Sequence, residues 1–170
     1  MKLHACVVVG LALLLAAPVL AGHSRLGLGA RYHTDHSVFT DLPYEDGDLG
    51  LGLSYQYHED LAYWELGVDF TPEVGESDGY ENYALTPEVN LVVKDRIWRA
   101  GLGGLMTYVH PEEGDDDWSD FYWQLLAGIS VPYGRLALDI MAYYPFENWG
   151  DLPDFEFGDM EFGGRLTNRF

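Results

Sequence analysis

The chain has 170 residues, with 28 Asp and Glu against 9 Lys and Arg, and its formal net charge is −19. A chain this acidic lacks the basic face that phosphate groups require, which excludes nucleic acid as a partner. Aromatic residues make up 15% of it, whereas disordered acidic chains are poor in aromatic residues, so a folded protein is expected.

The first residues have the composition of an export signal. Lys2 precedes an apolar run from Ala5 to Ala17, and the small-residue site Val19-Leu20-Ala21 follows it. The run is too short for a helix that spans a bilayer, and this order of segments is typical of a secretory signal peptide. We therefore predict a cleaved signal over residues 1–21 and one domain over residues 22–170. The single cysteine lies in the signal, so the domain has no disulfide chemistry.

Alternating apolar and polar residues, the pattern of a β-strand with two unlike faces, recur along the rest of the chain. Pro87 weakens one of these segments because proline cannot donate to a ladder. Another is ambiguous, since Leu105 and Val109 share a face with Arg99. Eight strands are predicted, over residues 24–33, 49–57, 62–70, 83–94, 97–109, 121–131, 136–144 and 160–170.

The connections between these segments alternate in length. Short turns fall near residues 58–60, 94–96 and 132–134, and the other four connections are long. Three turns at one end and four loops at the other are typical of transmembrane barrels, which have short periplasmic turns and longer external loops. The predicted fold is all-β: an eight-stranded antiparallel up-and-down transmembrane β-barrel with short periplasmic turns and four longer external loops.

Charge decides which face of the strands is the inner one. The polar faces carry Glu65, Glu88, Arg99, Asp139 and Arg165, which we predict to form an ionic network in the lumen. The opposite faces carry almost no charge along their middle and are suited to lipid. A closed barrel also satisfies every backbone group within a bilayer, because it has no edge.

The four long connections are acidic. Residues 34–47, 72–82, 110–120 and 145–159 hold Asp and Glu but no Lys or Arg, and the basic residues gather near the short turns and the termini. Such loops could meet anionic lipopolysaccharide through shared Mg²⁺ or Ca²⁺. The candidate metal ligands are the densest acidic cluster, whose spacing does not match an EF-hand and favours a solvated loop: Glu112, Glu113, Asp115, Asp116 and Asp117.

The chain ends on Phe170, with Phe162 and Leu166 on the same face of the last strand. With its eight strands, this ending resembles the small eight-stranded outer-membrane β-barrel proteins of Gram-negative bacteria. In that family the barrel assembly machinery reads a C-terminal aromatic residue preceded by alternating apolar residues. The resemblance therefore implies that Phe162, Leu166 and Phe170 form the assembly signal, although Asn168 departs from the pattern. It also implies an outer-membrane location.

An eight-stranded barrel fills its lumen with side chains, so the protein is porin-like in architecture but lacks a porin's pore. We expect a monomer without a cofactor that has a structural or loop-mediated role at the cell surface, in contact with outer-membrane lipid, lipopolysaccharide and divalent cations.

Two alternatives stay open. Some barrels of this kind are lipid A-modifying enzymes, either acyl hydrolases or acyltransferases, and this chain offers His36, Ser77 and Asp78 as a base, a nucleophile and an acid. The late strands hold none of the histidines that a lipid A deacylase places there. A soluble periplasmic barrel that binds an apolar ligand would instead need the row from Leu136 to Ile140 to point inward.

Overall fold

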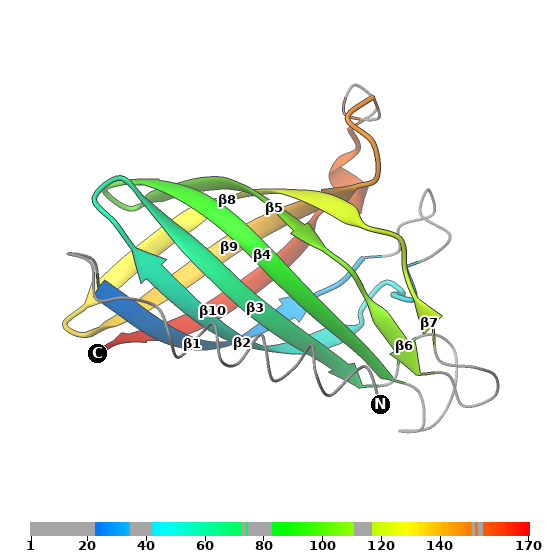
Figure 1. The fold of residues 1–170 in the computed structure, drawn as a ribbon, viewed down its shortest axis with the longest axis horizontal. Helices are drawn as coiled ribbons and strands as arrows, with labels where there is room; N and C mark the ends of the chain where they lie inside the picture. Colours follow the sequence, from blue (N-terminus) through cyan, green and yellow to red (C-terminus); the bar gives the residue numbers. More distant parts are fainter. Residues whose placement is uncertain are drawn as a thin grey trace.

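A single antiparallel sheet closes into a barrel in the computed structural model (Figure 1). The structure describes residues 23–34, 42–72, 74, 83–110, 117–150, 152 and 155–170, so the predicted signal lies outside it. The strands and one 3₁₀ turn are β1 (His23–Tyr32), β2 (Leu49–His58), β3 (Ala62–Pro72), β4 (Tyr83–Asp95), β5 (Trp98–Leu105), β6 (Tyr108–His110), β7 (Asp117–Trp118), β8 (Tyr122–Tyr133), β9 (Leu136–Phe146), η2 (Phe157–Asp159) and β10 (Glu161–Arg169).

These segments make eight barrel strands, because β5 and β6 follow one another along β4, and β7 precedes β8 beside them. Each strand pairs with its neighbours in the chain, and β1 pairs antiparallel with β10 from Arg25↔Arg169 to Tyr32↔Phe162. That pairing joins the two ends of the sheet. The predicted eight-stranded up-and-down barrel is therefore confirmed.

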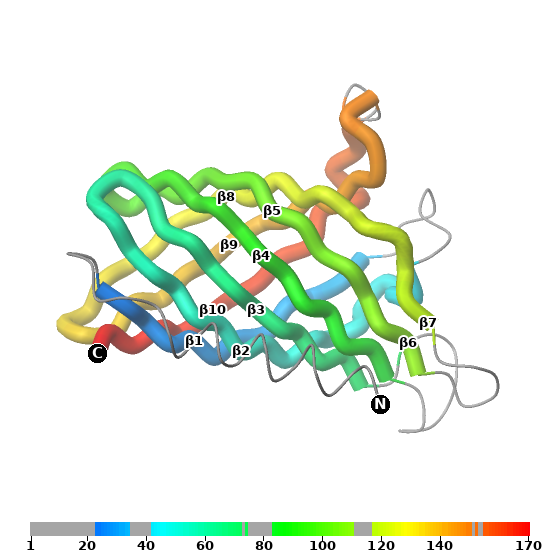
Figure 2. Tube along the Cα trace, viewed as in Figure 1, coloured from blue at the N-terminus to red at the C-terminus, as the bar shows by residue number. Residues whose placement is uncertain are grey.

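The two ends of the barrel differ as the connection lengths predict. The short turns are Glu59–Leu61, Arg96–Ile97 and Gly134–Arg135. Figure 2 shows the C-terminus beside the β8–β9 turn, at the end opposite to the long connections. In the terms of a transmembrane barrel, the turns and the C-terminus mark the periplasmic end, and the long connections mark the external end.

The outer face is apolar and the inner face is polar, the reverse of a water-soluble protein. Leu138 on β9 is 45% exposed, while the adjacent Asp139 is 5% exposed and points into the lumen. The same inversion holds on the other strands, where Asn90 and Gln124 are fully buried. The soluble alternative is wrong, because the row from Leu136 to Ile140 faces outward. No helix among the described residues is long and apolar enough to cross a membrane.

Pro87 lies inside β4, against the expectation that it would weaken this strand. Its carbonyl accepts from the N–H of Met106 at 3.4 Å, and the ring removes the N–H that would complete the pair. The break between β5 and β6 falls at this point, at Met106 and Thr107. A lost ladder bond thus divides the partner strand, and β4 itself continues.

The ambiguous pattern of residues 97–109 is explained by a change in the polarity of the lumen, which is charged at the periplasmic end and apolar at the external end. Arg99 faces inward at the periplasmic end, and Leu105 faces inward at the external end within an apolar cluster. One strand therefore carries a cation and a leucine on the same face. The other members of this cluster are Leu42, Tyr44, Val74, Ala84, Tyr122, Tyr144 and Phe146.

Candidate functional site

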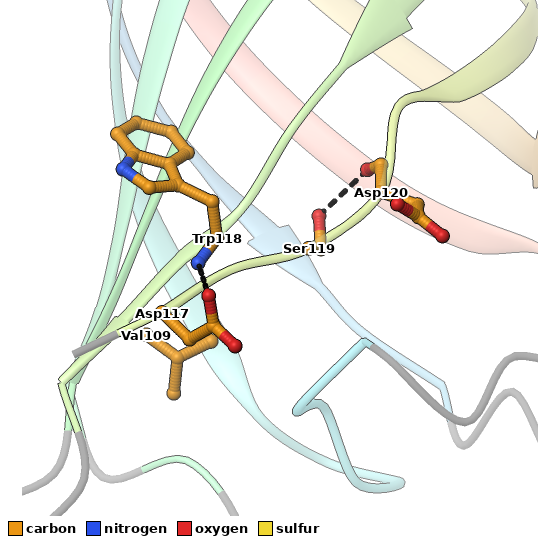
Figure 3. Close-up of a pocket in the computed structure, with 5 residues that line it drawn as sticks. All are labelled: Val109, Asp117, Trp118, Ser119 and Asp120. Carbon is orange, nitrogen blue, oxygen red and sulfur yellow. Dashed lines mark hydrogen bonds between the residues drawn. The ribbon is translucent and has the colours of Figure 1, made fainter. Parts of the chain in front are cut away.

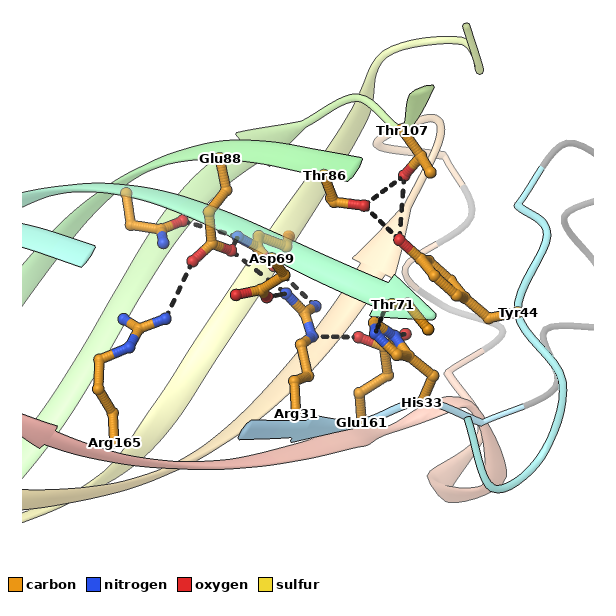
Figure 4. Close-up of polar contacts among 12 residues, drawn as sticks. Arg31, His33, Tyr44, Asp69, Thr71, Thr86, Glu88, Thr107, Glu161 and Arg165 are labelled. Atoms are coloured by element: carbon orange, nitrogen blue, oxygen red, sulfur yellow. Dashed lines mark hydrogen bonds and ion pairs between the residues drawn. The ribbon is translucent and has the colours of Figure 1, made fainter. Parts of the chain in front are cut away.

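Arg31, on β1, is the centre of a charged cluster in the lumen (Figure 4). Its Nε lies 2.5 Å from Oε2 of Glu161, and its Nη1 lies 3.2 Å from Oε2 of Glu88. Its Nη2 donates to Oε1 of Gln124 at 3.0 Å, and its guanidinium lies 4.1 Å from the ring centre of Tyr143. All five side chains are buried. A buried cation is tolerated only with partners of this kind.

A second buried cation, Arg165 on β10, shares a partner with the first. Its Nη1 lies 2.7 Å from Oε1 of Glu65, and its Nη2 donates to Oε1 of Glu88 at 3.4 Å. Figure 4 shows Glu88 between Arg165 and Arg31. Asp69 completes the set at 3.8 Å from Nη1 of Arg31. The cluster therefore joins β1, β3, β4 and β10 across the lumen.

Amide side chains supply the remaining hydrogen bonds to these carboxylates. Gln56 Nε2 donates to Oε2 of Glu65 at 2.7 Å and to Oδ2 of Asp139 at 3.4 Å. Asn90 Nδ2 donates to Oε1 of Glu65 at 3.1 Å. A buried carboxylate costs several kcal/mol to desolvate, on the order of the effective penalty for a buried ion, and this cost is offset only when its acceptor sites are filled. The amides reduce that cost, and they make the network continuous.

Glycines on the inner face make room for the long side chains that cross the lumen. Gly52 lies opposite Asp69 and Gly67 lies opposite Glu88 in the strand ladders. A Cβ atom at either glycine would collide with the carboxylate of that partner. Alternation of small and large inner residues is a usual way to fill a narrow barrel. These positions fix where the charged side chains can lie.

The first external loop closes the lumen beyond this cluster. The ring of Tyr44 stacks on His33, with centroids 3.8 Å apart and an angle of 7° between the planes. Its hydroxyl bonds the hydroxyls of Thr86 and Thr107 (Figure 4). Nδ1 of His33 lies 2.9 Å from Oε1 of Glu161, so the closure is continuous with the charged cluster.

Little space is left at this closure. The gap lined by Arg31, Leu42, Tyr44 and Leu105 has a volume of about 10 Å³, which is about the size of one water. Burial raises the pKa of Tyr44 to about 12, against the lowering effect of its two threonine hydrogen bonds. The phenol of Tyr44 therefore stays protonated at neutral pH, and its ring carries no charge that would favour exposure to water.

The external surface has a different chemistry from the lumen. On the last connection, Phe157 is 82% exposed, and Trp149 and Phe155 are also exposed. Phe155 packs on Phe157 with ring centres 5.1 Å apart, and it also packs on Tyr144 at 4.6 Å. Tyr144 is buried by such contacts. Figure 1 shows this connection rising from the barrel in orange.

A shallow groove lies where β6 meets β7 (Figure 3). It has a volume of about 330 Å³ and is lined by Val109, Asp117, Trp118, Ser119 and Asp120. Two internal bonds hold its wall: the N–H of Trp118 donates to Oδ1 of Asp117, and the hydroxyl of Ser119 donates to the carbonyl of Asp120, each at 2.8 Å. The groove presents two carboxylates and an indole at the external end.

Four of the five residues predicted for the ionic network lie in the central lumen. Arg99 does not join them. It faces the lumen at the periplasmic mouth, where its Nη1 donates to the carbonyls of Arg96 and Trp98 at 3.1 and 2.7 Å. The four that lie together are Glu65, Glu88, Asp139 and Arg165.

The other predicted residues fall on the surface or outside the described chain. Asp117 is exposed, and its carboxylate accepts from the adjacent N–H. Among the described residues, no group of three His, Cys, Asp or Glu side chains is arranged to hold a metal. Phe162, Leu166 and Phe170 lie exposed on the outer face. Outside the described residues lie His36, Ser77, Asp78, Glu112, Glu113, Asp115 and Asp116.

Sequence reasoning missed Arg31, Asp69 and Glu161 as members of the network. Each was already on the polar face of its strand by alternation, so the signal was present. His33, the last residue of the predicted strand over residues 24–33, was also missed as a lumen residue and is fully buried there. What the alternation did not supply was the depth of each residue along the barrel axis.

No protein-family model matches the chain, and no curated protein sequence matches it. Among solved structures, it is similar to Neisserial surface protein A, with 10% sequence identity, a TM-score of 0.52, and coverage of 89% of this chain and 98% of that one. It is also similar to Ail, the attachment invasion locus protein of Yersinia pestis in complex with the heparin analogue sucrose octasulfate. The identity is 12%, the TM-score is 0.40, and the coverage is 88% and 99%.

The likeness to Neisserial surface protein A extends over nearly the whole of both chains, and at this identity it concerns the fold alone. It agrees with the closed antiparallel sheet described above. In fold, the chain resembles the small eight-stranded outer-membrane β-barrel proteins.

Proposed function

We propose that this protein is a monomeric outer-membrane barrel that acts through its external loops, not through its lumen. Its loops would contact lipopolysaccharide at the cell surface, with divalent cations between the two. The observation that carries the proposal is the contrast between a filled lumen and an external end that exposes aromatic rings and carboxylates. The proposal includes export directed by a signal peptide over residues 1–21, which is then cleaved.

The lumen argues against transport. Arg31 and Arg165, on the neighbouring strands β1 and β10, hold carboxylates of β4 and β3 across the lumen, and Tyr44 closes the external end. A continuous water channel would require these charged side chains to separate in a medium that desolvates them. Eight strands enclose a space that side chains alone can fill. The function is therefore sought on the surface.

The external end has the chemistry of a cation-bridged surface. Its four loops hold 19 of the 28 acidic residues and no Lys or Arg. Carboxylates repel anionic glycolipid directly, but Mg²⁺ and Ca²⁺ bind oxygen ligands from both sides. The exposed indole of Trp149 is an amphipathic ring of the kind found at membrane interfaces, and the exposed ring of Phe157 adds apolar surface beside it.

The test places the protein in bilayers that contain lipopolysaccharide and in bilayers of phosphatidylcholine alone. We expect millimolar Mg²⁺ to raise the denaturant midpoint of unfolding in the first and not in the second, with EDTA reversing the rise. The variant Glu147→Gln/Glu156→Gln, which neutralises exposed carboxylates of the last loop, should lose much of the rise.

The matched control is Glu59→Gln/Asp60→Asn, which removes two exposed carboxylates at the periplasmic turn. It should keep the Mg²⁺ effect. An equal Mg²⁺ effect in both lipids, or an equal effect in the loop variant and the parent, would contradict the proposal.

A catalytic role is not part of the proposal. The mass of lipid A tests directly whether the protein has such a role. Cells that express the protein should show the same lipid A mass spectrum as cells that express His36→Ala or Ser77→Ala. A mass change of one acyl chain that depends on His36 or Ser77 would instead establish the enzymatic alternative.

A further inference from the structure

The periplasmic mouth of the lumen holds like charges in direct opposition. Arg25 on β1 is the ladder partner of Arg169 on β10, and Lys94 on β4 is the ladder partner of Arg99 on β5. By strand alternation all four lie on the inner face. Like charges directly opposite one another destabilise a sheet. Two such pairs at one end of one lumen therefore call for a compensating group.

The two pairs form one region. Arg25 interacts electrostatically with Arg99 and Arg169, and Lys94 interacts with Arg99 and Arg25. His23 and His58 also lie here, stacked with ring centres 4.8 Å apart. The mouth is thus lined by cations from β1, β4, β5 and β10, with two imidazoles beside them.

Carboxylates do not balance these charges. Among the described residues, the ion pairs of the lumen involve Arg31, His33 and Arg165 but none of the four cations at the mouth. Asp139 is the inward-facing carboxylate that acts on Arg25, and its Oδ2 already accepts from Gln56. The exposed Asp60, in the β2–β3 turn, acts on Lys94. Four cations against these two carboxylates leave an excess of positive charge.

One buried guanidinium donor at the mouth also lacks an acceptor. Nε of Arg25 is buried without a hydrogen-bond partner, although its Nη1 donates to Thr167 at 3.3 Å. Nη1 of Arg99 is held by two backbone carbonyls, which fixes the guanidinium in place. Guanidinium groups suit oxyanions because their N–H groups match paired oxygens.

We propose that the periplasmic mouth of the barrel is a binding site for a multiply charged oxyanion of the phosphate class, held by Arg25, Lys94, Arg99 and Arg169. A single carboxylate would leave most of the positive charge unbalanced, whereas a phosphate monoester carries about 1.5 to 2 negative charges at neutral pH and pyrophosphate carries more. The side chains face the lumen, which favours a soluble anion. The phosphodiester of an anionic lipid of the inner leaflet offers the same oxyanion group with one charge for each phosphate, so two or more headgroups would have to gather at the mouth.

The test uses the protein produced from its complete sequence and purified in dodecyl maltoside, which is uncharged and contains no phosphate. Sodium pyrophosphate is titrated into it at constant ionic strength and binding is measured by calorimetry. We expect saturable binding that Arg25→Gln/Lys94→Gln weakens at least about tenfold, the effect of removing charge-assisted hydrogen bonds of this strength.

The matched control is Arg135→Gln, which removes an exposed charge at the same end but in the β8–β9 turn. Its carbonyl still accepts from the N–H of Arg169 in this variant, and it should bind within about twofold of the parent because an exposed charge is screened by salt. Heat-modifiable mobility on a gel checks that each variant is folded. If the double variant fails that check, Arg169→Gln, whose side chain is exposed, takes its place with the same expectation.

A second arm separates the two sources of phosphate. The denaturant midpoint is compared in nanodiscs of phosphatidylcholine with and without phosphatidylglycerol. Pyrophosphate binding in detergent that the variant weakens supports a soluble anion. A phosphatidylglycerol-dependent rise in midpoint that the variant loses, without pyrophosphate binding, supports a lipid phosphate. The proposed site is ruled out if neither effect is seen. It is also ruled out if the double variant binds pyrophosphate as tightly as the parent.

Discussion

At the scale of single residues, Arg31 is the side chain on which the lumen depends most. It forms ion pairs with three carboxylates, bonds an amide, and lies over the ring of Tyr143. Replacing it would leave Glu161 and Glu88 buried with less compensation. A buried pair contributes little net stability, but the removal of one partner is costly because the other charge stays buried.

We expect Arg31→Met to lower the free energy of unfolding by about 3–5 kcal/mol, the usual cost of breaking a buried ion pair. Guanidinium unfolding in detergent, followed by tryptophan fluorescence, measures it. Arg135→Met, at an exposed turn, should change stability by about 0.5 kcal/mol or less. A loss below about 1 kcal/mol for Arg31→Met would mean that the network contributes much less than its contacts indicate.

At the scale of elements, two of the three periplasmic hairpins are joined by two-residue turns in which the first residue has a positive φ. That residue is Gly134 in the β8–β9 turn, with φ 65°, and Arg96 in the β4–β5 turn, with φ 51°. Glycine adopts this region without a Cβ clash, and arginine does not. The β4–β5 turn is therefore the more strained of the two.

Arg96→Gly should raise the free energy of unfolding by about 1 kcal/mol, because it removes the left-handed penalty on a residue with a Cβ atom. The carbonyl of Arg96 still accepts from Arg99 in this variant. Gly134→Ala is the reciprocal variant and should lower stability by a similar amount. Denaturant midpoints of both variants check the pair, and a lower midpoint for Arg96→Gly would contradict the turn argument.

The last strand, β10, combines closure of the barrel with the assembly signal that the family resemblance implies. Phe170 exposes its ring on the outer face, and its N–H donates to the carbonyl of Ser24 at 3.3 Å. We expect Phe170→Ala to reduce the heat-modifiable fraction in outer membranes several-fold while refolding in detergent stays close to that of the parent. Phe121→Ala, an exposed aromatic residue away from β10, should leave assembly unchanged. Equal assembly of the two variants would remove Phe170 from the signal.

At the scale of the whole molecule, polarity is inverted and charge is sorted along the barrel axis. Apolar side chains cover the outer face, the lumen is polar, and the acidic loops lie opposite the basic mouth. An apolar outer face of this extent requires lipid or detergent, since water-soluble proteins rarely expose large apolar patches. The closed ladder satisfies the backbone without water.

The folded protein should therefore resist denaturing detergent and migrate differently on a gel before and after boiling, and it should refold only when detergent or lipid is present. In planar bilayers it should give no conductance steps, because side chains fill its lumen. Folding in plain buffer would contradict the prediction that the barrel spans a membrane. Stable conductance steps would contradict a lumen filled by side chains.

The sequence by itself determined the barrel. Alternation with a period of two assigns each side chain to a face wherever one face is apolar, and the alternating lengths of the connections set the order of hairpins and the two unlike ends. These are local properties, so they can be read without knowledge of contacts. Pro87 shows the limit, because a missing N–H broke the neighbouring strand and not its own.

Only the tertiary structure decided which lumen residues meet. Arg165 lies opposite Asp139 in the β9–β10 ladder, yet it pairs across the lumen with Glu65. Arg99 shares the inner face but lies at the mouth, where no central carboxylate reaches it. Partners so far apart in the chain are brought together by strand tilt and by the stagger of the closed sheet. Both are properties of the whole barrel, and no local pattern of residues records them.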